Sequence, residues 1–196
     1  KCPGDTNDYV CQVCDGNGIV TSATNGADCD ILMVVMESGK CCEGVCLPIP
    51  QPGTDPCEWA MDNKNLMSPI DQNKLSPGSK VMGYVLCVFG EKYACTVPYN
   101  FPSLWGPNMK ACILQEENNH LGSTTAQCPP CIGMATYPNS TAWKDEECAA
   151  RAATFACMKG LTNGASSWYQ QTIRDALDGI WNDMNRMGCT NLPPTP

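Results

Sequence analysis

Cys128-Pro129-Pro130-Cys131-Ile132-Gly133 begins the stretch of sequence that decides the expected fold, and this stretch extends to residue 189. Two segments within it, residues 142–159 and residues 167–187, are rich in helix-forming residues. A glycine follows each segment, Gly160 after the first and Gly188 after the second, and glycine commonly ends helices. The C-terminal part of the chain therefore predicts two helices joined by a short loop.

Residues 167–187 have the strongest helical pattern in the chain. Ser167 and Gln170 have the spacing of a capping box, in which each side chain bonds a backbone N–H of the first turn. Apolar residues recur every three or four positions and form one face, which we expect to pack on its own domain. A partner groove or a lipid contact is the alternative use of this face. It consists of Tyr169, Ile173, Ala176, Leu177, Ile180, Trp181, Met184 and Met187.

Two cysteines lie within the first of these predicted helices. Cys148 and Cys157 would stand on opposite sides of the helix, about 13.5 Å apart along its axis. A disulfide needs Cα atoms within about 7 Å of each other, so these two cysteines cannot be bonded together. We therefore expect each to tie the helix to a different neighbour, while Cys189 staples the end of the second helix.

An earlier stretch has the same order of features in a shorter form. The Cys-x-x-Cys pair at residues 11–14 is followed by a Thr- and Asn-rich loop and then by Cys29. The pair at residues 128–131 is likewise followed by a polar loop and then by Cys148. We interpret the two stretches as a degenerate internal repeat, in which the third cysteine lies near the start of a helix.

Residues 28–38 would supply the helix of the first repeat, and Gly39 would end it. The alternative is a buried strand through residues 31–36. The residues at helical spacing are Cys29, Leu32, Met33 and Met36.

The middle of the chain predicts a β-hairpin. Residues 81–89 and residues 93–97 are rich in aromatic and β-branched residues, and they flank a three-residue loop that contains Gly90. Cys87 and Cys95 are nearly equidistant from this loop, and we expect them to face each other across it. Because an isolated hairpin is marginal in water, this one must join a further strand or be held by disulfides.

The segments between these elements complete the expected architecture. Residues 47–56 form a proline-rich connector, and the loop-like residues 99–127 contain a short helix over residues 108–117. The fold class expected is α+β, a small disulfide-rich secreted protein with two helix-bearing CxxC modules around a central β-hairpin segment. The segments are an N-terminal CxxC module (1–56), a central hairpin segment (57–111) and a C-terminal CxxC module with two helices and a proline-rich tail (112–196).

The chain has 16 cysteines in 196 residues, a density typical of disulfide scaffolds. The even number allows every cysteine to pair, which indicates an oxidising compartment and a secreted, extracellular protein. A cytosolic zinc protein is the weaker alternative, because zinc sites usually include histidine and the chain has one. The adjacent Cys41 and Cys42 are expected to bond different partners. The cysteines assigned to disulfides are Cys2, Cys11, Cys14, Cys29, Cys41, Cys42, Cys46, Cys57, Cys87, Cys95, Cys112, Cys128, Cys131, Cys148, Cys157 and Cys189.

This arrangement resembles the secreted cysteine-rich CxxC-repeat proteins of diatoms and related algae. The shared features are a Cys-x-x-Cys pair followed by glycine, a loop rich in Thr, Asn and Pro, and a cysteine that opens a helix. The likeness covers two pieces of the chain, one in each expected module. It implies an extracellular, glycosylated surface or matrix protein, and it brings no catalytic residues with it.

Charge and hydropathy exclude several classes of partner. The net charge is −8 with only 12 Lys and Arg residues and no basic run, which argues against nucleic acid or an anionic membrane. No apolar run approaches the ~20 residues of a membrane span. The chain begins at Lys1 without a signal peptide, which we interpret as a mature chain whose signal has been removed.

The sequence shows no catalytic, cofactor-binding or metal-binding constellation, so no cofactor is expected. His120 is the only histidine, which excludes sites that need two, and its polar neighbours predict a surface loop. No two of the 20 acidic residues stand out as a catalytic pair. A calcium site at Asp28 and Asp30, or at Asp5 and Asp8, would lack the EF-hand pattern. We expect the Cys-x-x-Cys pairs to be structural and not redox-active.

Two further features bear on function. Asn139 begins the only N-glycosylation sequon, and residues 191–196 form a Pro/Thr-rich tail suited to a stalk or an O-glycosylated linker. We expect a glycosylated extracellular structural protein, a subunit of a matrix, coat or filament that self-associates. The alternative is a secreted module that binds carbohydrate or another small ligand through Trp59, Trp105 or Trp143. An enzyme with a carboxylate pair is a third hypothesis.

Overall fold

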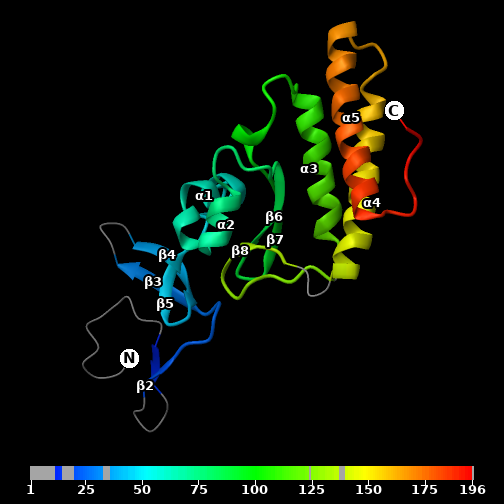
Figure 1. The fold of residues 1–196 in the computed structure, drawn as a ribbon. Helices are drawn as coiled ribbons and strands as arrows, with labels where there is room; N and C mark the ends of the chain where they lie inside the picture. The colour runs from blue at the N-terminus through cyan, green and yellow to red at the C-terminus, as the bar shows by residue number, and fades with distance from the viewer. Residues whose placement is uncertain (1–11, 15–19, 33–35, 124, 137–139, 196) are drawn as a thin grey trace.

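The structure, a computed structural model, describes residues 12–14, 20–32, 36–123, 125–136 and 140–195 (Figure 1). These residues form two small N-terminal sheets, a central sheet with short helices beside it, and a layer of three long helices. The mixture of helices and strands expected from the sequence is confirmed.

Two small antiparallel sheets form the N-terminal part. A disulfide between Cys29 and Cys46 joins the two outer strands of the second sheet across its middle strand. The first sheet contains β1 (Gln12–Cys14) and β2 (Val20–Ser22), and the second contains β3 (Asp28–Leu32), β4 (Met36–Cys42) and β5 (Val45–Pro48) in that order.

The helix predicted over residues 28–38 is wrong, because this segment contributes to β3 and β4. Cys29 pairs with Gly39 across these strands and is bonded to Cys46, so sheet hydrogen bonds and a disulfide override the helical spacing. Gly39 accordingly lies within a strand and ends no helix. Since Cys29 lies in a strand and Cys148 in a helix, the arrangement of two helix-bearing CxxC modules is not confirmed.

The central sheet is built on the predicted hairpin, which is confirmed. Strands β6 (Gly83–Val88) and β7 (Glu91–Thr96) are antiparallel, and β8 (Ile132–Met134) pairs with the other side of β6. Phe89 and Gly90 form the turn with φ values of 49° and 91°, and two positive φ values are the signature of a type I′ turn. As expected, the hairpin is stabilised both by a further strand and by disulfides.

The expectation that Cys87 and Cys95 face each other is wrong. The turn is one residue shorter than predicted, so each cysteine lies opposite a different residue of the hairpin. Cys87 is bonded to Cys128, and Cys95 to Cys57. The two cysteines therefore tie the hairpin to separate parts of the chain.

Short helices precede the central sheet in a segment that lacked a clear helical pattern. Asp55 caps the first of them by accepting a hydrogen bond from Cys57 N–H at 2.8 Å, and Pro56 occupies the first helical position. Ser68 and Pro69 start the second in the same way. The short helices are α1 (Pro56–Asp62), η1 (Lys64–Leu66), α2 (Pro69–Lys74) and, after β7, η2 (Pro98–Asn100).

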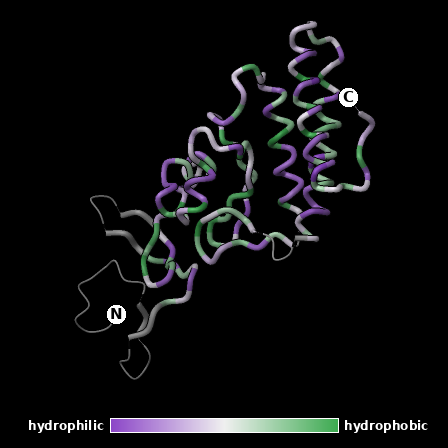
Figure 2. The backbone as a smooth tube through the Cα atoms, in the orientation of Figure 1, coloured by the Kyte–Doolittle hydropathy of each residue, from purple (hydrophilic) through white to green (hydrophobic). Residues whose placement is uncertain are grey.

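Three long helices form the C-terminal layer, α3 (Pro107–Leu121), α4 (Ser140–Gly160) and α5 (Ser167–Met187) (Figure 1). The last two confirm the helices predicted there, and α3 is longer at both ends than predicted. Hydrophilic and hydrophobic residues alternate along each helix (Figure 2), and the apolar faces meet in one core. Among the described residues, no helix is long and apolar enough to span a membrane. The core includes Met109, Ile113, Phe155, Met158, Ile173, Leu177 and Met184.

Helix α5 packs on its own domain through most of the apolar face predicted from its sequence. Gly188 ends the helix with a φ of 71°, as expected for the C-terminal glycine. The N-cap is Ser166, which accepts a hydrogen bond from Tyr169 N–H at 3.4 Å, and not Ser167 as predicted. Both positions hold serine, so the sequence does not distinguish the two caps.

Disulfides lie within each layer, and Cys42–Cys131 joins the N-terminal part to the central sheet, so the disulfide-rich character is confirmed. As predicted, α4 is tied to different neighbours, by Cys148 to Cys189 after α5 and by Cys157 to Cys112 of α3. Cys2 and Cys11 and the side chain of Cys14 lie outside the described part. The bonds are Cys29–Cys46, Cys42–Cys131, Cys57–Cys95, Cys87–Cys128, Cys112–Cys157 and Cys148–Cys189.

The structure also confirms the predictions for two motifs of closely spaced cysteines. Cys42 is bonded to Cys131, and Cys41 is disulfide-bonded as well, so these adjacent cysteines have different partners. Cys128 and Cys131 belong to two different disulfides and therefore do not form a redox pair with each other.

Gly83, the first residue of β6, lies against helix α3. A Cβ at this position would lie 2.6 Å from Oε1 of Glu117 and 2.9 Å from Cγ2 of Ile113, closer than such atoms approach. We expect Gly83→Ala to lower the free energy of unfolding by about 1–3 kcal/mol, because the helix must move away from the sheet. Denaturant titration followed by circular dichroism measures the change.

Gly179→Ala is the matched control for this substitution. A Cβ on Gly179 would project into open space on the exposed face of α5, so alanine should raise the free energy of unfolding by about 0.5–1 kcal/mol. Equal effects of the two substitutions would contradict the close packing of α3 on β6.

Candidate functional site

A cavity of about 400 Å³ lies where α3, α4 and the start of β6 meet. Its wall is unusual because several charged side chains are largely withdrawn from solvent there. The charged residues on the wall are Lys74, Lys80, Glu116, Glu117, His120, Glu147 and Arg151, and Trp143 lies beside them.

The two helices bring these groups together through matching spacings. On α3, Cys112, Glu116 and His120 follow one another at intervals of one helical turn and share one face. On α4, Glu147 and Arg151 share a face in the same way. The disulfide from Cys112 to α4 lies at one end of these facing stripes, so the charged residues of α3 and α4 meet along the rest.

His120 forms the centre of the cluster and contacts two carboxylates of α4. Its Nδ1 lies 2.8 Å from Oε1 of Glu146, and its Nε2 lies 3.5 Å from Oε2 of Glu147. Ser123 and Thr125 donate hydrogen bonds from their hydroxyls to Glu146. Glu146 is therefore fixed in place, and it orients the ring so that Nε2 faces Glu147.

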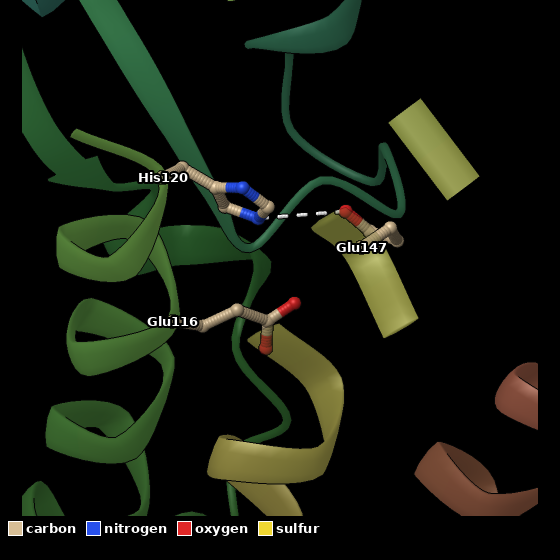
Figure 3. Close-up of side chains that lie close together, drawn as sticks. All are labelled: Glu116, His120 and Glu147. Carbon is tan, nitrogen blue, oxygen red and sulfur yellow. Dashed lines mark ion pairs between the residues drawn. The ribbon is translucent and has the colours of Figure 1, made fainter. Parts of the chain in front are cut away.

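Arg151 and Thr154 hold the other carboxylates of the cluster. The Nε of Arg151 lies 2.9 Å from Oε1 of Glu147 and 3.8 Å from Oε1 of Glu116. The hydroxyl of Thr154 donates to Oε2 of Glu116 at 2.7 Å. In Figure 3 the side chains of Glu116, His120 and Glu147 point into the space between α3 and α4. One ligand atom from each of these three lies within 4.8 Å of the others, an arrangement that suits a metal ion.

Glu117 differs from its neighbours because its carboxyl makes no hydrogen bond or ion pair within the described part of the chain. It is 9% exposed and lines the same cavity. The missing side chain of Gly83 leaves the room that Glu117 occupies. The hydroxyl of Tyr84, and not the carboxyl of Glu117, is the fully buried side-chain polar atom without a partner in the described part of the chain, so the Glu117 oxygens keep some contact with solvent in the cavity. Withdrawing most of this carboxyl from water still costs free energy.

The surroundings shift the pKa values of these groups in opposite directions. Burial raises the pKa of Glu117 to about 8, and the nearby Glu116 carboxylate adds to the effect. Burial alone would lower the pKa of His120, but hydrogen bonds to Glu147 and Glu146 outweigh it and raise the pKa to about 9. The pKa of Glu147 is lowered, because its bonds to His120 and Arg151 outweigh its burial. Near neutral pH the site thus combines a protonated carboxyl, an ionised carboxylate and two cations.

The prediction that His120 is a surface residue in a loop is wrong. It lies in the last turn of α3 and is only 5% exposed. The polar Asn118 and Asn119 before it suggested a loop, but they lie on the exposed face of α3, whereas His120 faces α4. Cys112, Glu116 and His120 are spaced one helical turn apart, so they share one face of a helix. Because Cys112 is bonded to Cys157 of α4, that face must lie against α4, and this spacing could have predicted the burial of His120.

The other residues singled out from the sequence lie elsewhere or lack a described position. Trp143 lies on the cavity, whereas Trp59 packs against the core of the central sheet and Trp105 against the helical core. Asp28 forms an exposed ion pair with Lys40 at 3.8 Å. The residues that lie outside the described part are Asp5, Asp8 and Asn139, together with the side chain of Asp30.

Comparison of the chain with protein-family models, with curated proteins and with solved structures gave no match. The function must therefore be argued from the cavity and its side chains.

The raised pKa values of Glu117 and His120 predict how stability depends on pH. Both groups hold protons in the folded protein that the unfolded chain has already released, so stability falls as the pH rises. The contribution of His120 is complete below its ordinary pKa of 6.5 and is lost as the pH rises through about 9. Glu117 causes a further loss between its ordinary pKa of 4.5 and about 8. From pH 6.5 to pH 9 the free energy of unfolding should fall by on the order of 5 kcal/mol, about 3 from His120 and about 2 from Glu117.

Urea titrations at several pH values, with EDTA present to remove stray metal ions, measure this fall. Glu117→Gln should remove the contribution of Glu117, which ends at about pH 8, and His120→Gln should remove the contribution of His120, which begins near pH 6.5 and extends to pH 9. A wild-type stability that rises between pH 6.5 and pH 9 would show that these two protons are not bound in the folded state.

Proposed function

We propose that the chain is an extracellular, disulfide-stapled module that binds a carbohydrate or another small polyhydroxylated ligand. The observation that carries this proposal is the cavity of about 400 Å³, which combines buried charged side chains with the partly exposed indole of Trp143. Cavities of this size are typical of small-molecule sites, and such sites place a few polar groups on a shaped wall.

The side chains of the cavity match the chemistry of a sugar. Hydroxyl groups both donate and accept hydrogen bonds, and the carboxylate of Glu147 and the guanidinium of Arg151 are the corresponding acceptor and donor. Lys74 and Lys80 add further donors on the same wall. Trp143 is 40% exposed and offers an indole face on which the apolar face of a sugar ring can stack.

The extracellular setting is supported by the density of disulfides. Bonds of this kind persist in oxidising environments and are rare where thiols are kept reduced. The sequon at Asn139 fits the same setting, and a glycan on this residue is part of the proposal.

Glycan-array screening followed by calorimetry with the best ligand tests the binding function. Trp143→Ala should weaken binding about 10-fold, which corresponds to a loss of about 1.4 kcal/mol of stacking energy. Trp168→Ala is the matched control, because Trp168 is also exposed but lies on α5 away from the cavity, and it should bind like the wild type. The absence of any ligand on the array, or an equal effect of the two substitutions, would contradict this function.

A structural subunit of a matrix, coat or filament is the second candidate, in keeping with the resemblance to algal CxxC-repeat proteins. It is favoured by the density of disulfides within each layer and by Cys42–Cys131, which joins the N-terminal part to the central sheet. Cross-links of this kind suit a protein that bears load or resists proteolysis. The proline-rich tail does not support a contact with a second subunit. Trp181 Nε1 of α5 donates a hydrogen bond to the carbonyl of Pro193 at 3.1 Å, so the tail packs on a helix of its own chain.

Electron microscopy and light scattering of unreduced protein at high concentration test the structural role. Ordered filaments or sheets are the expected result if the chain is a structural subunit. A monodisperse monomer at every concentration would contradict this candidate.

A further inference from the structure

The ligand atoms of Glu116, His120 and Glu147 are arranged almost as a metal ion would require (Figure 3). Three ligands bound to one ion at about 2.1 Å lie about 3.0–3.4 Å from one another. Nε2 of His120 and Oε2 of Glu147 are already 3.5 Å apart. The three atoms all lie within 4.8 Å of one another, so small rotations of the side chains would complete the geometry.

The orientation of His120 is the one that metal-binding histidines adopt. Such a ring usually donates its second N–H to a carboxylate, which fixes the tautomer and leaves the other nitrogen for the metal. Glu146 fills this role, since its Oε1 lies 2.8 Å from Nδ1 of His120. Ser123 and Thr125 hold Glu146 in turn. Three residues outside the ligand set thus position Nε2 of His120 toward Glu147.

Arg151 and Thr154 leave room for an ion beside the carboxylates that they contact. Arg151 lies nearest to Oε1 of Glu147, whereas Oε2 is the oxygen that faces His120. Arg151 is more distant from Glu116, at 3.8 Å, and Thr154 bonds the other oxygen of that residue. Each carboxylate can therefore keep its neighbour and still offer a lone pair to a metal ion.

A divalent cation would reduce the excess negative charge of the cluster. A histidine that binds a metal is neutral, so the carboxylates of Glu116, Glu146 and Glu147 face the single positive charge of Arg151, which also pairs with Asp183. A divalent ion would compensate most of this excess, which favours charges withdrawn from water.

Glu117 is an independent sign that the site takes a ligand. Its side chain is more than nine-tenths buried, it lies on the wall of the same cavity, and it has no hydrogen-bond partner among the described residues. Burial removes most of the hydration of this carboxyl, its oxygens keep some access to the solvent in the cavity, and a ligand there could supply a hydrogen bond. A water bound to the ion would give the carboxyl that partner.

We propose that Glu116, His120 and Glu147 bind a divalent transition-metal ion such as zinc, with Glu146 as the positioning residue of His120 and Glu117 on the wall of the same cavity. The mixture of imidazole and carboxylate ligands suits zinc or manganese and not calcium, which prefers oxygen ligands alone. The metal site goes beyond the carbohydrate ligand proposed above and does not depend on it.

Titration of untagged, EDTA-treated wild-type protein with Zn²⁺ tests the site without any substitution. Because His120 is the only histidine of the chain, its two ring nitrogens can be followed individually by ¹⁵N NMR. We expect the Nε2 signal to shift until one Zn²⁺ is bound per chain, while Nδ1 keeps its proton. An imidazole spectrum that does not change when Zn²⁺ is in excess would overturn the proposal, whatever the outcome of glycan binding.

Calorimetry on substituted proteins assigns the ligands. Glu147→Gln and His120→Gln should each weaken Zn²⁺ binding at least about 100-fold, and Glu146→Gln should weaken it about 10- to 100-fold by releasing the ring. Asp178→Asn, which removes an exposed acid on α5, is the control and should bind Zn²⁺ like the wild type. Equal affinity of Glu147→Gln and Asp178→Asn would show that Zn²⁺ binds elsewhere. Ca²⁺ should not compete at equal concentration, and competition would contradict the choice of metal.

Discussion

The disulfide between Cys112 and Cys157 fixes the register on which the candidate site depends. It joins α3 to α4 at one end of two facing stripes of side chains. From this point, each turn of α3 meets a turn of α4 running the other way, so Glu116 meets Thr154 and His120 meets Glu147. A shift of one helical turn, about 5.4 Å, would separate every one of these pairs. A covalent bond thus decides which charges meet.

Burying these charges carries a cost that packing alone does not explain. Removing ions from water costs several kcal/mol each, and mutual attraction repays this only where the geometry and the hydrogen bonds are good. Arg151, which contacts carboxylates of α3, α4 and α5, and His120, which contacts two, meet that condition for most of the cluster. Glu117 does not benefit in this way, since burial pushes its pKa to about 8. An apolar residue at this position would be more favourable for folding, which favours a role in binding.

The elements that the sequence predicts correctly are those whose secondary structure follows from their local residue pattern. Helix α5 has a long apolar face and a terminal glycine, and the hairpin of β6 and β7 has β-branched strands around a glycine turn. Residues 28–38 mislead because their spacing suits a helix, whereas the bond from Cys29 to Cys46 holds them in a sheet. His120 misleads for a similar reason. Its burial depends on contact with α4, which is distant in the sequence, and the residues next to His120 do not predict that contact.

The disulfides also explain how so small a protein tolerates a polar cluster beside its core. The bond between Cys112 and Cys157 closes a loop with a sequence separation of 45 and, in the chain-entropy view, destabilises the unfolded state by about 4 kcal/mol. The bond between Cys148 and Cys189 does the same for a separation of 41 and secures α5 against α4. These contributions offset a large part of the cost of the buried charges. They also fix α3 and α4 against each other, and with them the side chains of the cluster, which would lower the ordering cost of binding a ligand there. The same two disulfides therefore stabilise the folded chain and fix the arrangement of the side chains in the cluster.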